Sequence, residues 1–156
     1  MARISLSLLL LAAAPLWAQS SKLALPGCEV PPEIQKTLND KLTGPAFYKL
    51  SFVEQETLRR TVLTDLATRY PREIVPQRRL IAAERDEDEA LHPGTWAAVL
   101  AKERKQAKER SDDPVVLDLA AYALEGIDTP QSVEWLNAAK KEAPQFVWPD
   151  LDLAEI

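Results

Sequence analysis

Residues 114–156, PVVLDLAAYALEGIDTPQSVEWLNAAKKEAPQFVWPDLDLAEI, decide how the fold is interpreted. Apolar residues recur at helical spacing over 115–124 and 129–142, with Gly126 between the two runs and Pro144 closing the second. A third helix is expected to begin between residues 147 and 150 and to continue to Ile156. Because the connections are short and each helix presents one apolar stripe, we expect neighbouring helices to pack antiparallel as hairpins.

The helical pattern continues upstream of this stretch. It predicts helices over about 32–42, 51–70, 72–85 or 74–85, and 95–110, the last with Thr95 as its N-cap. The chain has four glycines, and Ala, Leu, Glu, Lys and Arg recur in windows separated by prolines, whereas strand-type alternation is nearly absent. An acidic run at 84–89 lacks the glycine and the spaced acid of a calcium loop, so we interpret it as a solvated helix end or linker. The predicted fold class is all-α.

Small and large residues are arranged over 114–144 so that two helices can approach closely. The first helix carries a large apolar residue, a small one and a third contact; the second carries small, large and small residues, and a proline closes the pair. These positions are Leu119, Ala120, Ala123, Ser132, Leu136, Ala139 and Pro144. A step of 34 residues from Leu119-Ala120 lands on Leu153-Ala154. The pattern resembles the tetratricopeptide repeat. The match is best over 114–156 and looser upstream, and the spacing between 96 and 110 does not follow the repeat.

The resemblance implies a short solenoid of stacked antiparallel hairpins whose first helices line a concave groove. Leu117, Asp118, Ala121 and Glu125 would then face a protein or peptide partner. Family members that clamp a peptide carboxylate carry basic and amide residues on that face. Leu117 and Ala121 occupy those places here, so clamping of that kind is not expected.

The first 18 residues have the composition of a signal peptide. Arg3 gives a positive start, residues 4–17 are mainly apolar, and Ala18 ends a segment that a signal peptidase would cleave before Gln19. The apolar run is shorter than the roughly 20 residues of a membrane span. We therefore expect export to the periplasm or the medium of a bacterium, with no membrane attachment after cleavage.

The chain then divides into three parts. Residues 1–18 are the signal peptide, and residues 19–50 form an irregular N-terminal arm with one short helix, bounded by turns at Pro26-Gly27 and Gly44-Pro45. Residues 51–156 form the repeat domain, which is expected to be incomplete at its C-terminal end because the last helix runs to Ile156 without a cap.

Charge excludes one class of partner. Removal of Arg3 with the signal peptide leaves 18 basic against 24 acidic residues, a formal net charge of −6. The basic residues are interspersed with acids, as in the run from Lys102 to Arg110, so they form no patch of one sign. Binding to nucleic acid is not expected.

The inventory of reactive side chains is small. Cys28 is the single cysteine, and it lies too far behind the apolar run to be a lipobox cysteine, so it is interpreted as a buried thiol or as a thiol that bridges to another chain. His92 precedes a Pro-Gly turn and is assigned to a helix start or the surface. Trp96, Trp135 and Trp148 lie among apolar residues and are assigned to packing. We therefore expect no enzyme activity, no cofactor and no metal site.

Two functions fit these observations. The first is an exported helical scaffold that binds a protein or peptide partner in the cell envelope. The alternative is the helical front part of a longer exported protein with a thioredoxin-like redox domain downstream, in which Cys28 pairs with a cysteine outside this sequence. The alternative rests on analogy with that domain arrangement.

Overall fold

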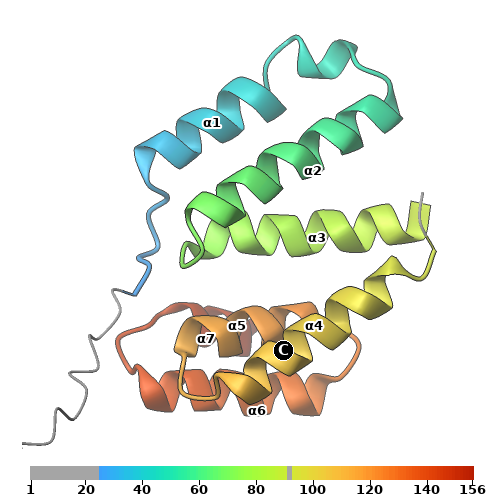
Figure 1. Cartoon of the computed structure of the whole chain (residues 1–156). Helices are drawn as coiled ribbons and strands as arrows, with labels where there is room; N and C mark the ends of the chain where they lie inside the picture. Colours follow the sequence, from blue (N-terminus) through green and yellow to red (C-terminus); the bar gives the residue numbers. More distant parts are fainter. Residues whose placement is uncertain (1–24, 91–92) are drawn as a thin grey trace, which may run out of the picture.

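The computed structural model describes residues 25–90 and 93–156, which form seven α-helices, one 3-10 turn and no strand (Figure 1). The all-α prediction is confirmed for these residues. The predicted signal peptide and His92 lie outside them. The elements are α1 (Pro32–Leu42), η1 (Phe47–Lys49), α2 (Phe52–Arg69), α3 (Ile74–Ala90), α4 (Thr95–Glu109), α5 (Pro114–Ala123), α6 (Thr129–Glu142) and α7 (Trp148–Glu155).

Local capping explains most of the helix starts. Helix α2 begins with a capping box, in which Ser51 Oγ accepts from the Glu54 amide and the Glu54 carboxylate accepts from the Ser51 amide at 2.9 Å. Helix α6 is capped by Asp128, whose carboxylate accepts from the Gln131 amide at 3.3 Å. The N-cap of α4 is Gly94, with φ of 98°, and not Thr95. Its left-handed backbone favours glycine.

The prediction for the end of α3 is wrong by five residues. The sequence indicated an end near Arg85, but the helix continues to Ala90 and includes the acidic run. Glutamate is a good helix former, and no glycine or proline interrupts 84–90, so nothing in the local chemistry stops the helix there.

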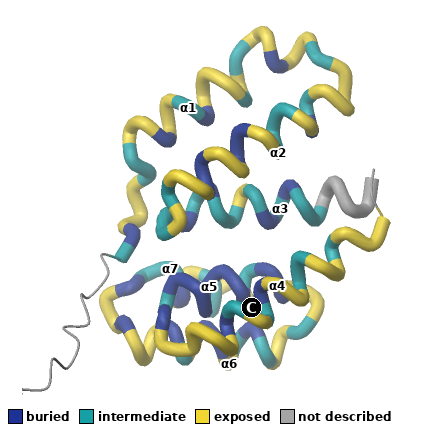
Figure 2. Tube along the Cα trace, in the orientation of Figure 1, coloured by how far each residue is buried: buried dark blue, intermediate teal, exposed yellow. Residues whose placement is uncertain are grey.

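Each helix packs against the next one in sequence, and α5 also contacts α3 and α7. In Figure 1, α1, α2 and α3 lie together at the top and α4 to α7 lie below them. Buried residues line the sides of the helices that face one another (Figure 2). Within the described part of the chain, no helix has the length and apolar character needed to cross a membrane.

Three apolar clusters hold the helices together. One joins α1, α2 and α3 and includes Ile34 and Leu38, so α1 packs into the same body as α2 although the sequence indicated an arm up to residue 50. A second joins α3 and α5 to the segment before α7 through Ile74, Leu119 and Phe146. The third lies between α4, α5 and α6. Burial of this apolar surface is the main source of stability.

The two ends of the 34-residue step differ in environment. Leu119 and Ala120 are buried in α5, whereas Leu153 of α7 is half-buried and Ala154 is exposed. Ala120 lies on a helix packed by neighbours on several sides, whereas α7 packs mainly against α5 and α6 and reaches α3 through Asp152 and Trp148. Small size is therefore a packing requirement at residue 120 but not at residue 154.

Candidate functional site

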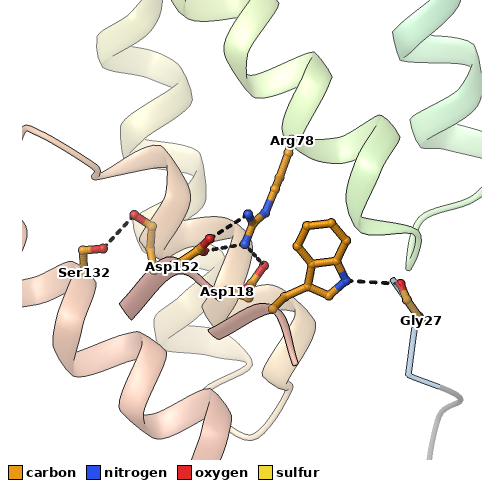
Figure 3. A network of polar contacts seen from close by, with 7 residues as sticks. Gly27, Arg78, Asp118, Ser132 and Asp152 are labelled. Carbon is orange, nitrogen blue, oxygen red and sulfur yellow. Dashed lines mark hydrogen bonds and ion pairs between the residues drawn. The ribbon is translucent and has the colours of Figure 1, made fainter. Parts of the chain in front are cut away.

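A cluster of charged side chains joins three helices that are distant in sequence. Arg78 comes from α3, Asp118 from α5 and Asp152 from α7. Arg78 Nη2 donates to Asp118 Oδ2 at 2.8 Å, and Arg78 Nη1 donates to Asp152 Oδ1 at 2.9 Å (Figure 3). One guanidinium therefore binds two carboxylates, which is the geometry that the five donors of arginine allow.

Two aromatic rings enclose the same guanidinium. The Cζ atom of Arg78 lies 4.8 Å from the ring centroid of Tyr122 and 4.8 Å from that of Trp148. Both distances are within the range of cation–π attraction. The indole nitrogen of Trp148 donates to the Gly27 carbonyl at 3.2 Å, so the cluster also fixes the segment before α1 (Figure 3).

Burial disfavours the ionised form of Asp118 in this cluster. Asp118 is fully buried, and burial raises the pKa of its carboxyl from 3.8 to about 6; the charge and hydrogen bond of Arg78 offset part of that rise. The negative charge of Asp152, which binds the same guanidinium, adds a smaller rise to the pKa of Asp118. Among the described residues, Asp118 Oδ1 and Arg78 Nε have no hydrogen-bond partner. Two carboxylates thus share one cation.

The cluster is suited to holding helices together. Its guanidinium donates to two carboxylates and lies against two rings, and only 13% of its side chain is exposed. Little of Arg78 is left to contact a ligand. The described residues also contain no group of three or more His, Cys, Asp or Glu placed to hold a metal ion.

A shallow hollow lies next to the cluster, between α5, α6 and α7. The Ser132 hydroxyl donates to the Ala121 carbonyl at 3.0 Å and fixes the crossing of α5 and α6 at its base (Figure 3). The acids Glu125 and Asp152 lie on its rim together with Ile156, which is 54% exposed. The hollow is lined by Ala121, Tyr122, Glu125, Ser132, Leu136, Asp152 and Ile156.

The structure places the four residues expected to line a groove differently: Ala121 and Glu125 line the hollow, whereas Leu117 and Asp118 do not. Leu117, Asp118 and Ala121 are buried, and only Glu125 is exposed. Leu117 and Ala121 belong to the apolar core between α4, α5 and α6, and Asp118 binds Arg78 beneath the surface. Helix α5 is covered by neighbouring helices over most of its surface, so it has no open face at Leu117 and Asp118. Cys28 is exposed, which makes its interpretation as a buried thiol wrong and leaves the thiol accessible.

Sequence reasoning missed Arg78, Tyr122 and Asp152 as members of one site. The signal that could have found them is Asp118 itself, because one acid in a helix that is otherwise apolar requires a cation when buried. The partner could not be identified from sequence, since Arg78 lies 40 residues away and the chain offers many other basic residues.

Comparison of the chain with protein-family models, with curated proteins and with solved structures found no match. The family resemblance therefore rests on the spacing in residues 114–156.

Proposed function

We propose that this chain is an exported helical scaffold that binds a segment of a protein partner at the hollow between α5, α6 and α7. One observation carries the proposal: the hollow combines an exposed apolar side chain, that of Ile156, with two acids on its rim, Glu125 and Asp152. Apolar contact supplies affinity at such sites, and charge complementarity selects the partner.

The chemistry of the hollow defines the partner segment. An apolar side chain would cover Ile156, and a basic side chain would approach the exposed carboxylate of Glu125. The proposed partner segment therefore combines an apolar residue with a neighbouring Lys or Arg. Binding is favoured over catalysis because Arg78, Asp118 and Asp152 beside the hollow are already paired with one another.

Three further observations support a scaffold. Helices pack in sequence order, and α5 contacts both α3 and α7, as successive helices do in stacked-hairpin proteins. The 34-residue step from Leu119 to Leu153 agrees with such a repeat. The composition of residues 1–18 favours delivery to the cell envelope.

A capture experiment tests the proposal. The full chain, tagged and expressed in its native host, is compared with Glu125→Arg, which reverses the charge on the rim of the hollow. The matched control is Glu142→Arg, an exposed position in the last turn of α6, about 9 Å along the helix axis from Leu136 at the hollow. We expect discrete envelope proteins to be captured by the wild type and the control and to be lost with Glu125→Arg. Capture that is the same for all three chains, or none above background, contradicts the proposal.

A further inference from the structure

Exposed apolar side chains are concentrated in the connection between α1 and α2. The described residues expose six large apolar side chains, and three of them, Tyr48, Phe52 and Val53, lie within positions 48–53. Each of the three is more than half exposed. Tyr48 belongs to η1, and Phe52 and Val53 form the start of α2. Exposed apolar residues that occur together in this way mark interaction sites, and we refer to residues 48–53 as the tip.

The tip is held in a defined shape. Phe47 is buried beneath it, and its ring packs against that of Tyr48 in an edge-on contact with the ring centroids 5.6 Å apart. The guanidinium of Arg59 in α2 lies 5.8 Å from the centroid of the Phe47 ring, within the range of cation–π attraction. Because η1 is fixed against α2, the tip needs little ordering before it binds a partner.

The tip also carries an accessible positive charge. Lys49 is exposed next to Tyr48, and Lys41 is exposed in the last turn of α1, which leads into the connection. Glu54 follows the tip, but its carboxylate already accepts from the Ser51 amide at 2.9 Å and from the Ser51 hydroxyl at 2.6 Å. The tip therefore presents apolar groups beside a lysine.

The hollow between α5, α6 and α7 has the complementary chemistry. Ile156 is exposed there, and Glu125 and Asp152 lie on the rim. The hollow thus selects an apolar side chain next to a basic one, and Tyr48 and Lys49 of the tip are such a pair. We propose that the tip of one copy of this chain binds the hollow of a second copy. The inference rests on the proposed function, because it takes the hollow as the binding site and names its partner.

The contact forms between copies and not within one. In Figure 1, α1, α2 and the connection between them lie above α3, whereas α5, α6 and α7 lie below it. The tip and the hollow of one copy therefore cannot meet. Because two different surfaces come together, a copy that is bound through its tip keeps a free hollow, and the association can continue from copy to copy.

The overall charge of the protein keeps this contact weak. The formal net charge is −5 with the leader and −6 without it, so two copies repel one another at long range. The hollow is shallow, and small interfaces are typical of transient contacts. We therefore expect reversible association that depends on protein concentration.

Sedimentation velocity tests the inference on the protein as its native host processes it. We expect the weight-average mass to rise above that of one copy as the protein concentration increases, and to fall again on dilution. A mass equal to that of one copy at every concentration overturns the proposal.

Charge reversal identifies the contact. Lys49→Glu and Glu125→Arg each place like charges at the contact, so each should weaken the association about tenfold. The double variant restores opposite charges and should recover most of the lost affinity. With the fold intact by circular dichroism, unchanged association in either single variant, or no recovery in the double variant, overturns the proposal.

Two matched controls make the same changes of charge elsewhere. Lys108→Glu lies in the last turn of α4 and Glu142→Arg in the last turn of α6. Both positions are exposed and lie outside the tip and the lining of the hollow. We expect both controls to associate as the wild type does. If they lose as much affinity as Lys49→Glu and Glu125→Arg, the net charge determines the association and the proposal is overturned.

The capture experiment separates this inference from the proposed function. If a second copy is the partner, the protein that the tagged chain captures is the untagged copy made by the host. A protein that sediments as one copy at every concentration, but captures other envelope proteins through Glu125, keeps the proposed function and overturns the choice of a second copy. A protein that neither associates nor captures contradicts both.

Discussion

Arg78 Nη2 lies 2.8 Å from Asp118 Oδ2, although the two residues are 40 positions apart and belong to different helices. The same guanidinium also binds Asp152 of α7, so one side chain joins α3, α5 and α7. Because Asp118 is fully buried, this ion pair carries a large electrostatic cost if either partner is removed. The hollow proposed to bind a partner lies beside it and depends on the position of α7.

Replacing Arg78 should destabilise the fold strongly. Arg78→Gln leaves the Asp118 carboxylate buried without a cation, and breaking a buried pair in this way typically costs about 3–5 kcal/mol. Urea unfolding at pH 7, followed by tryptophan fluorescence, measures the loss in the free energy of unfolding.

Arg79→Gln is the control, because Arg79 is the next residue and is exposed. Its free energy of unfolding should lie within about 0.5 kcal/mol of the wild type. If both variants lose the same free energy of unfolding, the loss comes from replacing an arginine in α3 and not from breaking the buried ion pair.

The pH dependence of stability should show the titration of Asp118. Its pKa in the folded protein, about 6, is above its ordinary value of 3.8, so the folded state binds more protons between these values. Its contribution to stability is complete below pH 3.8 and is lost as the pH rises through 6. Asp118→Asn keeps the shape and cannot titrate. The free energy of unfolding of the wild type minus that of Asp118→Asn should fall by roughly 2 kcal/mol between pH 4.5 and pH 7.

This comparison removes other titrating groups. Asp113 has a lowered pKa in the folded protein, so its contribution has the opposite sign and is lost as the pH falls. Asp113 is present in both chains and cancels in the difference. A difference that is constant or rises with pH would show that the carboxyl of Asp118 titrates near or below its ordinary value.

The two alanines of the 34-residue step should respond differently to enlargement. Ala120→Leu adds volume to the core between α4, α5 and α6 and should cost about 1–3 kcal/mol of unfolding free energy. Ala154→Leu lies at an exposed position and should change it by less than about 0.5 kcal/mol. Thermal unfolding of both variants measures this; equal losses would show that residue 154 is packed as tightly as residue 120.

Sequence reasoning predicted the helices well where local chemistry defines them. The limits of α1 and α6 agree with prediction because prolines and caps mark them. The end of α3 was missed because an acidic run was interpreted as a helix end, although its residues favour helix. Leu117 and Asp118 were misplaced because the face that α5 presents depends on how α3, α6 and α7 cover it. Those contacts are long-range and leave no local signal.

Export is tested by an intact mass. The protein recovered from its native host should have the mass of residues 19–156 with a free thiol at Cys28, which is exposed. A mass that includes residues 1–18 would contradict cleavage after Ala18. A much larger mass, or a bridged Cys28, would favour the alternative of a longer protein with a redox domain.

Site-specific photocrosslinking in the native host tests the binding proposal most directly. A photoreactive residue is placed at Glu125 on the rim of the hollow and, in a second strain, at Glu142 away from it. The account predicts discrete adducts with envelope proteins from position 125 and none of these adducts from position 142. The absence of adducts at 125, or the same adducts from both positions, would contradict it.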